Sequence, residues 1–156
     1  MRVLNYIKLM RLPFLSASVI PYFIGAAYVF SKEGIGLFNV RFLIGLSAVI
    51  FGHIGANILN DYFDSRSGND WQDRAEHLFF GGSKMIQKGL VSERNTFLTG
   101  IVLISLSILS VVLLQFIVRE IPVILFSLAI LFLAVSYSAP PLKLAYRGLG
   151  ELVIFI

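Results

Sequence analysis

Residues 40–70 read VRFLIGLSAVIFGHIGANILNDYFDSRSGND, an apolar run that passes directly into a polar one. The apolar part, Val40 to Leu59, has the roughly 20 residues that a helix needs to cross the hydrocarbon core of a bilayer. Lipid offers the backbone no hydrogen-bond partners, so a segment of this kind is expected to be helical. The polar part would then lie at the mouth of that helix, where the chain leaves the membrane.

Three other apolar stretches have a comparable length, and each is expected to be a further transmembrane helix: Pro13–Phe30, Thr96–Val118 and Ile121–Ser138. Apolar residues make up 57% of the 156 residues and charged residues only 14%, which is unusual for a soluble domain. The sequence therefore predicts an all-α fold, a polytopic transmembrane helical bundle with four complete spans in the lipid bilayer.

The formal charge of +4 does not indicate a nucleic-acid partner, because the Lys and Arg residues are scattered between apolar blocks. They instead predict the membrane orientation. Ten of the 13 lie on one side, in the amino terminus, the long connector 60–95 and the loop after the last span. Positive residues favour the cytoplasm. We therefore expect an integral, multi-pass protein of the cell inner membrane whose Asp-rich connector is cytoplasmic.

Residues Glu151 to Ile156 begin another apolar stretch that is too short to cross a bilayer. One interpretation is a short tail packed on its neighbours. The other is the start of a fifth helix, which we favour. Residues 1–156 are then expected to be the amino-terminal part of one membrane domain.

The predicted helix carries a polar stripe if it continues past Leu59. His53, Asn57, Asn60 and Asp64 are separated by four, three and four residues, so they share one face. Polar groups at this depth are costly unless they face a bundle interior or a wet cavity, which makes the stripe a candidate site. His53 lies deeper and is expected to be a hydrogen-bonded packing residue. Three glycines would let other helices approach closely: Gly45, Gly52 and Gly55.

Gly68 is a natural helix stop that would turn the chain and bring Asp70 back toward Asp64. Oxygen ligands of this kind suit magnesium (Mg²⁺), which commonly takes one or two carboxylates and completes its shell with water and substrate phosphate. The sequence therefore predicts Asn60, Asp64 and Asp70 as catalytic residues and metal ligands. The alternative is a solvated helix cap and loop, for which Asn and Asp are also common.

Several basic residues on the same side of the membrane could hold phosphate oxygens. Gly81-Gly82-Ser83-Lys84 offers backbone amides, a hydroxyl and an ammonium group, and the last loop adds Lys143 and Arg147. We predict diphosphate contacts for Lys84, Lys143 and Arg147. The alternative is that they are ordinary cytoplasmic anchors. Three tyrosines near the polar segments could stabilise a cation through their ring faces or line the acceptor side: Tyr62, Tyr137 and Tyr146.

The segment Asn60 to Asp70 resembles the first Asp-rich motif of the UbiA superfamily of intramembrane aromatic prenyltransferases, which is N-D-x-x-D-x-x-x-D in many members. Here Gly68 stands in the last Asp position and Asp70 follows two residues later. This arrangement is similar to the branch that prenylates 1,4-dihydroxy-2-naphthoate in menaquinone biosynthesis. Two later segments also resemble that branch: YSAPPLK at 137–143 and YRGLGE at 146–151.

The resemblance implies a bundle of about nine spans around a central cavity. Two Asp-rich motifs would each hold magnesium against the diphosphate of a polyprenyl donor, and an aromatic acceptor would attack the prenyl group. Asn60, Asp64 and Asp70 match the first motif, and Lys143 stands where the family has a diphosphate-contacting lysine. The second motif is expected beyond residue 156.

Other functions stay open on the sequence alone. Within the same enzyme class, the acceptor could be 4-hydroxybenzoate, a tetrapyrrole or a glycerophosphate. A divalent-cation transporter would also place Asp and Asn at membrane depth. A non-catalytic membrane assembly protein would bind neither metal nor prenyl diphosphate.

Overall fold

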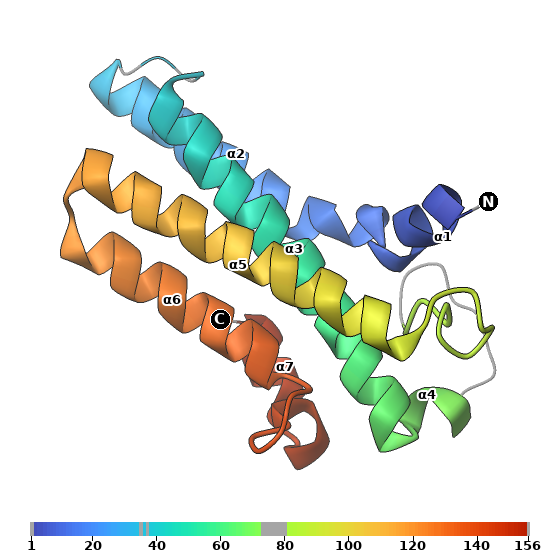
Figure 1. Ribbon diagram of the computed structural model, residues 1–156. Helices are drawn as coiled ribbons and strands as arrows, with labels where there is room; N and C mark the ends of the chain where they lie inside the picture. Colours follow the sequence, from blue (N-terminus) through green and yellow to red (C-terminus); the bar gives the residue numbers. More distant parts are fainter. Residues whose placement is uncertain (1, 35, 37, 73–80, 156) are drawn as a thin grey trace.

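The computed structural model describes residues 2–34, 36, 38–72 and 81–155, and every regular element within these ranges is a helix (Figure 1). The elements, in chain order, are α1 (Arg2–Leu9), the 3-10 helix η1 (Leu12–Leu15), α2 (Ser16–Glu33), α3 (Val40–Ser67), α4 (Asn69–Gln72), α5 (Glu93–Val118), α6 (Ile121–Ser136), the 3-10 helix η2 (Leu144–Arg147) and α7 (Gly150–Phe155). The predicted all-α class is confirmed.

Three helical stretches are long and apolar enough to cross a membrane, namely Leu12–Glu33, Val40–Ser67 and Glu93–Val118. Helix α6 is also apolar but has 16 residues, which corresponds to about 24 Å at the usual helical rise. The chain is therefore a helical membrane bundle. Helix α7 covers Gly150–Phe155, and the fifth span expected to begin there stays a prediction.

The helix boundaries differ from those of the predicted spans at several ends, and α2 (Ser16–Glu33) runs three residues past Phe30. Helix α3 continues past its apolar part, which ends at Leu59, for two more turns to Ser67, and Gly68 ends it with a left-handed φ of 85°, as predicted. Helix α5 begins at Glu93, because Ser92 caps it by accepting a hydrogen bond from the Asn95 amide at 3.2 Å. Helix α6 ends at Ser136, two residues before the predicted end.

Helices α3 and α5 pack closely because small residues line their contact. A Cβ on Gly55 would come within 3.0 Å of the Ile104 backbone nitrogen, and one on Gly100 within 2.7 Å of the Leu59 side chain. Ser107 on α5 donates to the main-chain oxygen of Ala48 on α3 at 2.7 Å. Small residues are the usual means by which helices associate in lipid, so the predicted role of the glycines on α3 is confirmed.

The polar end of α3 is surrounded by segments that lie far apart in the sequence. Figure 1 shows α1, α4 and α7 at this end, and the turns after α2 and α5 at the other. Leu9 is fully buried in a cluster that joins the amino terminus, α3 and the connector: Leu9, Ile54, Ile58, Met85 and Val91. The amino terminus, the described part of the connector and the last loop thus meet at one end, as the charge pattern predicts.

Candidate functional site

The polar stripe on α3 divides into a deep part and a mouth. His53 lies deep in the helix, where its Nδ1 is 2.7 Å from the Ser18 hydroxyl of α2. This contact confirms that His53 is a hydrogen-bonded packing residue. At the mouth, the Asn60 amide donates to Asp64 Oδ2 at 2.9 Å, as the spacing of one helical turn allows.

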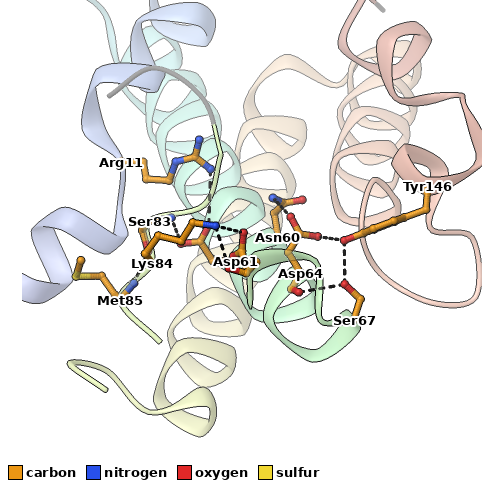
Figure 2. A network of polar contacts seen from close by, with 10 residues as sticks. Arg11, Asn60, Asp61, Asp64, Ser67, Ser83, Lys84, Met85 and Tyr146 are labelled. Atoms are coloured by element: carbon orange, nitrogen blue, oxygen red, sulfur yellow. Dashed lines mark hydrogen bonds and ion pairs between the residues drawn. The ribbon is translucent and has the colours of Figure 1, made fainter. Parts of the chain in front are cut away.

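Asn60 and Asp64 are also bound by side chains that follow α6. The Ser138 hydroxyl donates to Asn60 Oδ1, and the Tyr146 hydroxyl donates to Asp64 Oδ1. Ser67, one turn beyond Asp64, lies 3.0 Å from the Tyr146 hydroxyl and donates to the main-chain oxygen of Asp64. Figure 2 shows Asn60, Asp64, Ser67 and Tyr146 pointing toward one another. We call this set, with Ser138, the Asp64 network.

Tyr146 is a hydrogen-bond donor in this network at neutral pH. Partial burial and the bond to Asp64 raise the pKa of Tyr146 to about 12, because both favour the neutral phenol over a phenolate beside a carboxylate. Lys143 lies close by, with its Nζ 5.9 Å from the centre of the Tyr146 ring. The structure thus brings three predicted site residues, Asn60, Asp64 and Tyr146, into one network, with Lys143 beside it.

Asp70 and Lys84 form a second, buried pair. Lys84 Nζ is 2.9 Å from Asp70 Oδ1 and 3.1 Å from the Asp70 main-chain oxygen, and both residues are only 5% exposed. Gly82 packs against the Asp70 carboxylate so closely that a Cβ there would clash with it. The predicted metal ligand and the predicted phosphate-binding lysine therefore contact each other.

A third contact involves Asp61, for which the sequence alone predicts no role. Asp61 is 2% exposed, accepts a hydrogen bond from the Ser83 amide at 3.1 Å and lies 3.7 Å from an Arg11 guanidinium nitrogen. Figure 2 shows Arg11 and Ser83 on the opposite side of α3 from Tyr146. Nothing in the local sequence pattern indicates these partners, because one lies in the amino-terminal segment and the other in the connector.

The remaining predicted residues lie outside these contacts. Tyr62 packs against Phe97, with ring centres 4.9 Å apart, and accepts a hydrogen bond from Arg66. Arg147 donates to the main-chain oxygen of Pro141 at 3.0 Å. Two hollows open nearby. One of about 400 Å³ is lined by Tyr62, Phe63, Arg66, Ser67, Pro140 and Lys143, and one of about 350 Å³ is lined by Tyr137, Ala145, Gly148, Gly150, Glu151 and Ile154.

The family model of the UbiA prenyltransferase family matches residues 18–156. The chain belongs to this family. Comparisons with curated proteins and with solved structures gave no match. The matched region of the UbiA family contains both sides of the Asp64 network, α3 and residues 137–147. It also contains Asp61, Asp70 and Lys84, whereas Arg11 lies before it.

The donor set of this UbiA family chain fits magnesium by its chemistry. Asn60, Asp64 and Asp70 offer hard oxygen atoms, and Asp70 Oδ2 is buried without a hydrogen-bond partner among the described residues. Among the residues that the structure describes, no three His, Asp or Glu side chains lie close enough together to hold a metal ion by themselves. A metal ion here would therefore need further oxygen ligands from phosphate and water, which is how magnesium usually binds with nucleotides and diphosphates.

Sequence reasoning missed Ser138, Ser67 and Asp61 as members of the site. Ser138 lies within the segment YSAPPLK, beside Tyr137, so the family resemblance pointed to its neighbourhood but not to its side chain. Ser67 lies one turn after Asp64 on the same face, so helical spacing carries a signal for it. For Asp61 the only signal is its place in the motif.

Proposed function

We propose that this chain carries the first Asp-rich site of a magnesium-dependent prenyltransferase that transfers a prenyl group from a polyprenyl diphosphate to an aromatic acceptor. Family membership supports prenyl transfer. The acceptor proposed is 1,4-dihydroxy-2-naphthoate, in menaquinone biosynthesis, because residues 137–143 and 146–151 resemble that branch. The observation that carries the proposal is the Asp64 carboxylate at the mouth of α3, oriented by Asn60 and Tyr146.

Asn60, Asp64 and Asp70 are the residues that would hold the ion. Magnesium, when bound, supplies positive charge to the leaving diphosphate. Asn60 and Tyr146 hold the two oxygens of Asp64 from different sides, which fixes the direction of its lone pairs. This orientation is the contribution of the protein to a preorganised electrostatic site.

Basic residues at the same end of the bundle would bind the diphosphate oxygens. Lys143 lies beside Tyr146 and lines the same hollow as Ser67, so it adjoins the Asp64 network. Lys84 is directed toward Asp70. Arg147 follows Tyr146 directly in η2. We assign these three cations to the diphosphate, and the rings of Tyr62, Tyr137 and Tyr146 to the prenyl cation or the acceptor.

The membrane would hold the prenyl chain of the donor and its diphosphate in different surroundings. Helices α2, α5 and α6 expose large apolar side chains, such as Ile24, Phe116 and Phe126, to the surroundings of the bundle. A prenyl chain is soluble in the same lipid phase, whereas its diphosphate needs the polar end. Water would be scarce around the prenyl carbon, which limits hydrolysis. We place the polar end in the cytoplasm, because most Lys and Arg residues lie there.

The test is Asp64→Asn in the complete membrane protein, assayed for prenyl transfer from farnesyl diphosphate with magnesium. The change keeps the shape of the side chain and removes its charge, so turnover should fall about a hundredfold or more. Glu93→Gln is the matched control, because it removes a carboxylate at the first turn of α5 and should leave turnover unchanged. Turnover of Asp64→Asn within a few-fold of wild type would contradict the proposal.

The same assay separates the alternatives. Comparing 1,4-dihydroxy-2-naphthoate with 4-hydroxybenzoate as acceptor identifies the branch by the ratio of kcat/KM values. Magnesium flux into proteoliposomes without prenyl diphosphate would instead identify a cation transporter.

A further inference from the structure

Asp61 is a buried carboxylate that lies beside the Asp64 network but faces away from it. Successive residues of a helix are rotated by about 100°, so Asp61 points to a different side of α3 than Asn60 and Asp64. Its two oxygens are directed at two other segments, Oδ2 at the Ser83 amide at 3.1 Å and Oδ1 at Arg11 at 3.7 Å (Figure 2). Asp61 therefore connects three parts of the chain.

Charge pairing explains why this carboxylate is tolerated inside the protein. A buried ionised carboxylate is costly unless it is paired and hydrogen-bonded. The Arg11 side chain is 12% exposed and supplies the positive charge. Arg11 is itself fixed, because it occupies the turn between α1 and η1 with a φ of 50°, and Leu9, two residues earlier, is fully buried.

The hydrogen bond from Ser83 fixes the backbone one residue before Lys84. Gly82 lies against the Asp70 carboxylate, and Lys84 adopts a left-handed φ of 60°, which is unfavourable for a residue with a side chain. The Lys84 ammonium then reaches Asp70. Residues 82–84 are thus held between two carboxylates, Asp61 on α3 and Asp70 beyond its end.

We infer that Asp61, together with Arg11, is a positioning residue that sets the Lys84–Asp70 pair for binding the magnesium diphosphate. The inference rests on the proposed function, which assigns Lys84 and Asp70 to that ligand. Asp61 acts through the backbone of Ser83, and the substrate does not contact it. A lysine has a long flexible side chain, so a fixed backbone lowers the entropy lost when its ammonium binds an anion.

Two variants of the complete membrane protein test this role, Asp61→Asn and Arg11→Gln. The probe is farnesyl thiodiphosphate, an unreactive analogue of the donor, bound in the presence of magnesium. Each variant should raise the Kd of the probe about tenfold. The reason is that the charged hydrogen bond from Lys84 to the diphosphate is misplaced rather than removed. The KM for the acceptor should not change. Arg11→Lys keeps the charge and should recover most of the affinity.

The double variant and a matched control separate positioning from general damage. The double variant Asp61→Asn/Arg11→Gln removes both charges of the pair and so leaves no unpaired buried charge. Its Kd for the probe should be no higher than that of the single variant that binds the probe more weakly. Ser65→Ala is the control, because Ser65 is buried one turn along the same face of α3, outside these contacts, and should bind the probe within twofold of wild type. Hydrogen–deuterium exchange across residues 81–85 should become faster in Asp61→Asn and stay as in wild type in Ser65→Ala.

Two results would overturn the inference. One is unchanged exchange across residues 81–85 in Asp61→Asn. The other is an unchanged Kd for the probe in both single variants, with a lower melting temperature as their only effect. A wild-type protein that does not bind the probe is a different result, since it would overturn the proposed function directly and remove the ligand that Asp61 is inferred to serve. The two failures are therefore distinguishable.

Discussion

Tyr146→Phe is the most direct perturbation of the Asp64 network, because it removes one hydroxyl and keeps the ring. That hydroxyl donates to Asp64 and lies 3.0 Å from Ser67. A hydrogen bond to a charged group contributes about 1.5–3 kcal/mol. Tyr146 is 43% exposed, so water partly replaces the lost donor and the lower value applies. This corresponds to about a tenfold effect.

The expected result is an apparent magnesium affinity about tenfold weaker in the prenyl-transfer assay, because Asp64 loses the group that orients it. The measurement is turnover at fixed prenyl diphosphate over a series of magnesium concentrations. Tyr28→Phe, which removes the hydroxyl of an exposed tyrosine on α2, is the control. An apparent magnesium affinity of Tyr146→Phe within twofold of wild type would show that Tyr146 does not orient Asp64 for the metal ion.

The pH dependence of this effect follows from the raised pKa of Tyr146. Its value of about 12 in the folded protein lies above the ordinary value of 10.0. The bond between Tyr146 and Asp64 therefore contributes stability that is fully present below pH 10 and is lost as the pH rises through about 12. The stability difference between wild type and Tyr146→Phe should accordingly stay constant from pH 7 to 9, as measured by thermal unfolding in detergent.

Two further predictions concern the second pair. Lys84→Met leaves the Asp70 charge buried and unpaired, so we expect the free energy of unfolding to fall by about 3–5 kcal/mol. Adding Asp70→Asn removes that charge and should recover most of the loss. Lys32→Met at the exposed end of α2 is the control, and equal melting temperatures for the two single lysine variants would contradict burial of the pair. Gly82→Ala places a Cβ against Asp70 and should cost about 1–3 kcal/mol, whereas Gly25→Ala, with open space around it, should not destabilise.

The long apolar helices were predictable from the sequence because each is set by a local property. Apolar length identifies the spans, and Gly68 ends α3 because it can adopt the left-handed conformation that the turn requires. Apolar length alone does not give the end of α3, because polar residues continue this helix. Helix α3 runs to Ser67 although residues 60–67 are largely polar, because side-chain bonds one turn apart, such as that between Asn60 and Asp64, support the helix beyond its apolar part.

The partners of the acidic residues were not predictable in the same way. Tyr146 reaches Asp64 across 82 positions of the chain, and Lys84 reaches back 14 positions to Asp70. Helical periodicity places a residue on a face but does not say which segment covers that face. The sequence indicated that Asp64, Tyr146 and Lys143 lie at one end of the bundle, and the structure supplies the pairing. The catalytic and metal-binding roles of these residues stay predictions.

The spacing within Asn60-Asp61-Tyr62-Phe63-Asp64 explains how one short motif can organise two separate contacts. Asn60 and Asp64, four residues apart, share the face that meets Ser138 and Tyr146. Asp61, only one residue on, is rotated by about 100° and meets the amino terminus and the connector instead. Both contacts are built on the same two turns of α3 past Leu59, where Tyr62 packs against Phe97 of α5. One helix, α3, therefore sets both the positions of Asn60 and Asp64 and the position of the Lys84 segment at the mouth of the bundle.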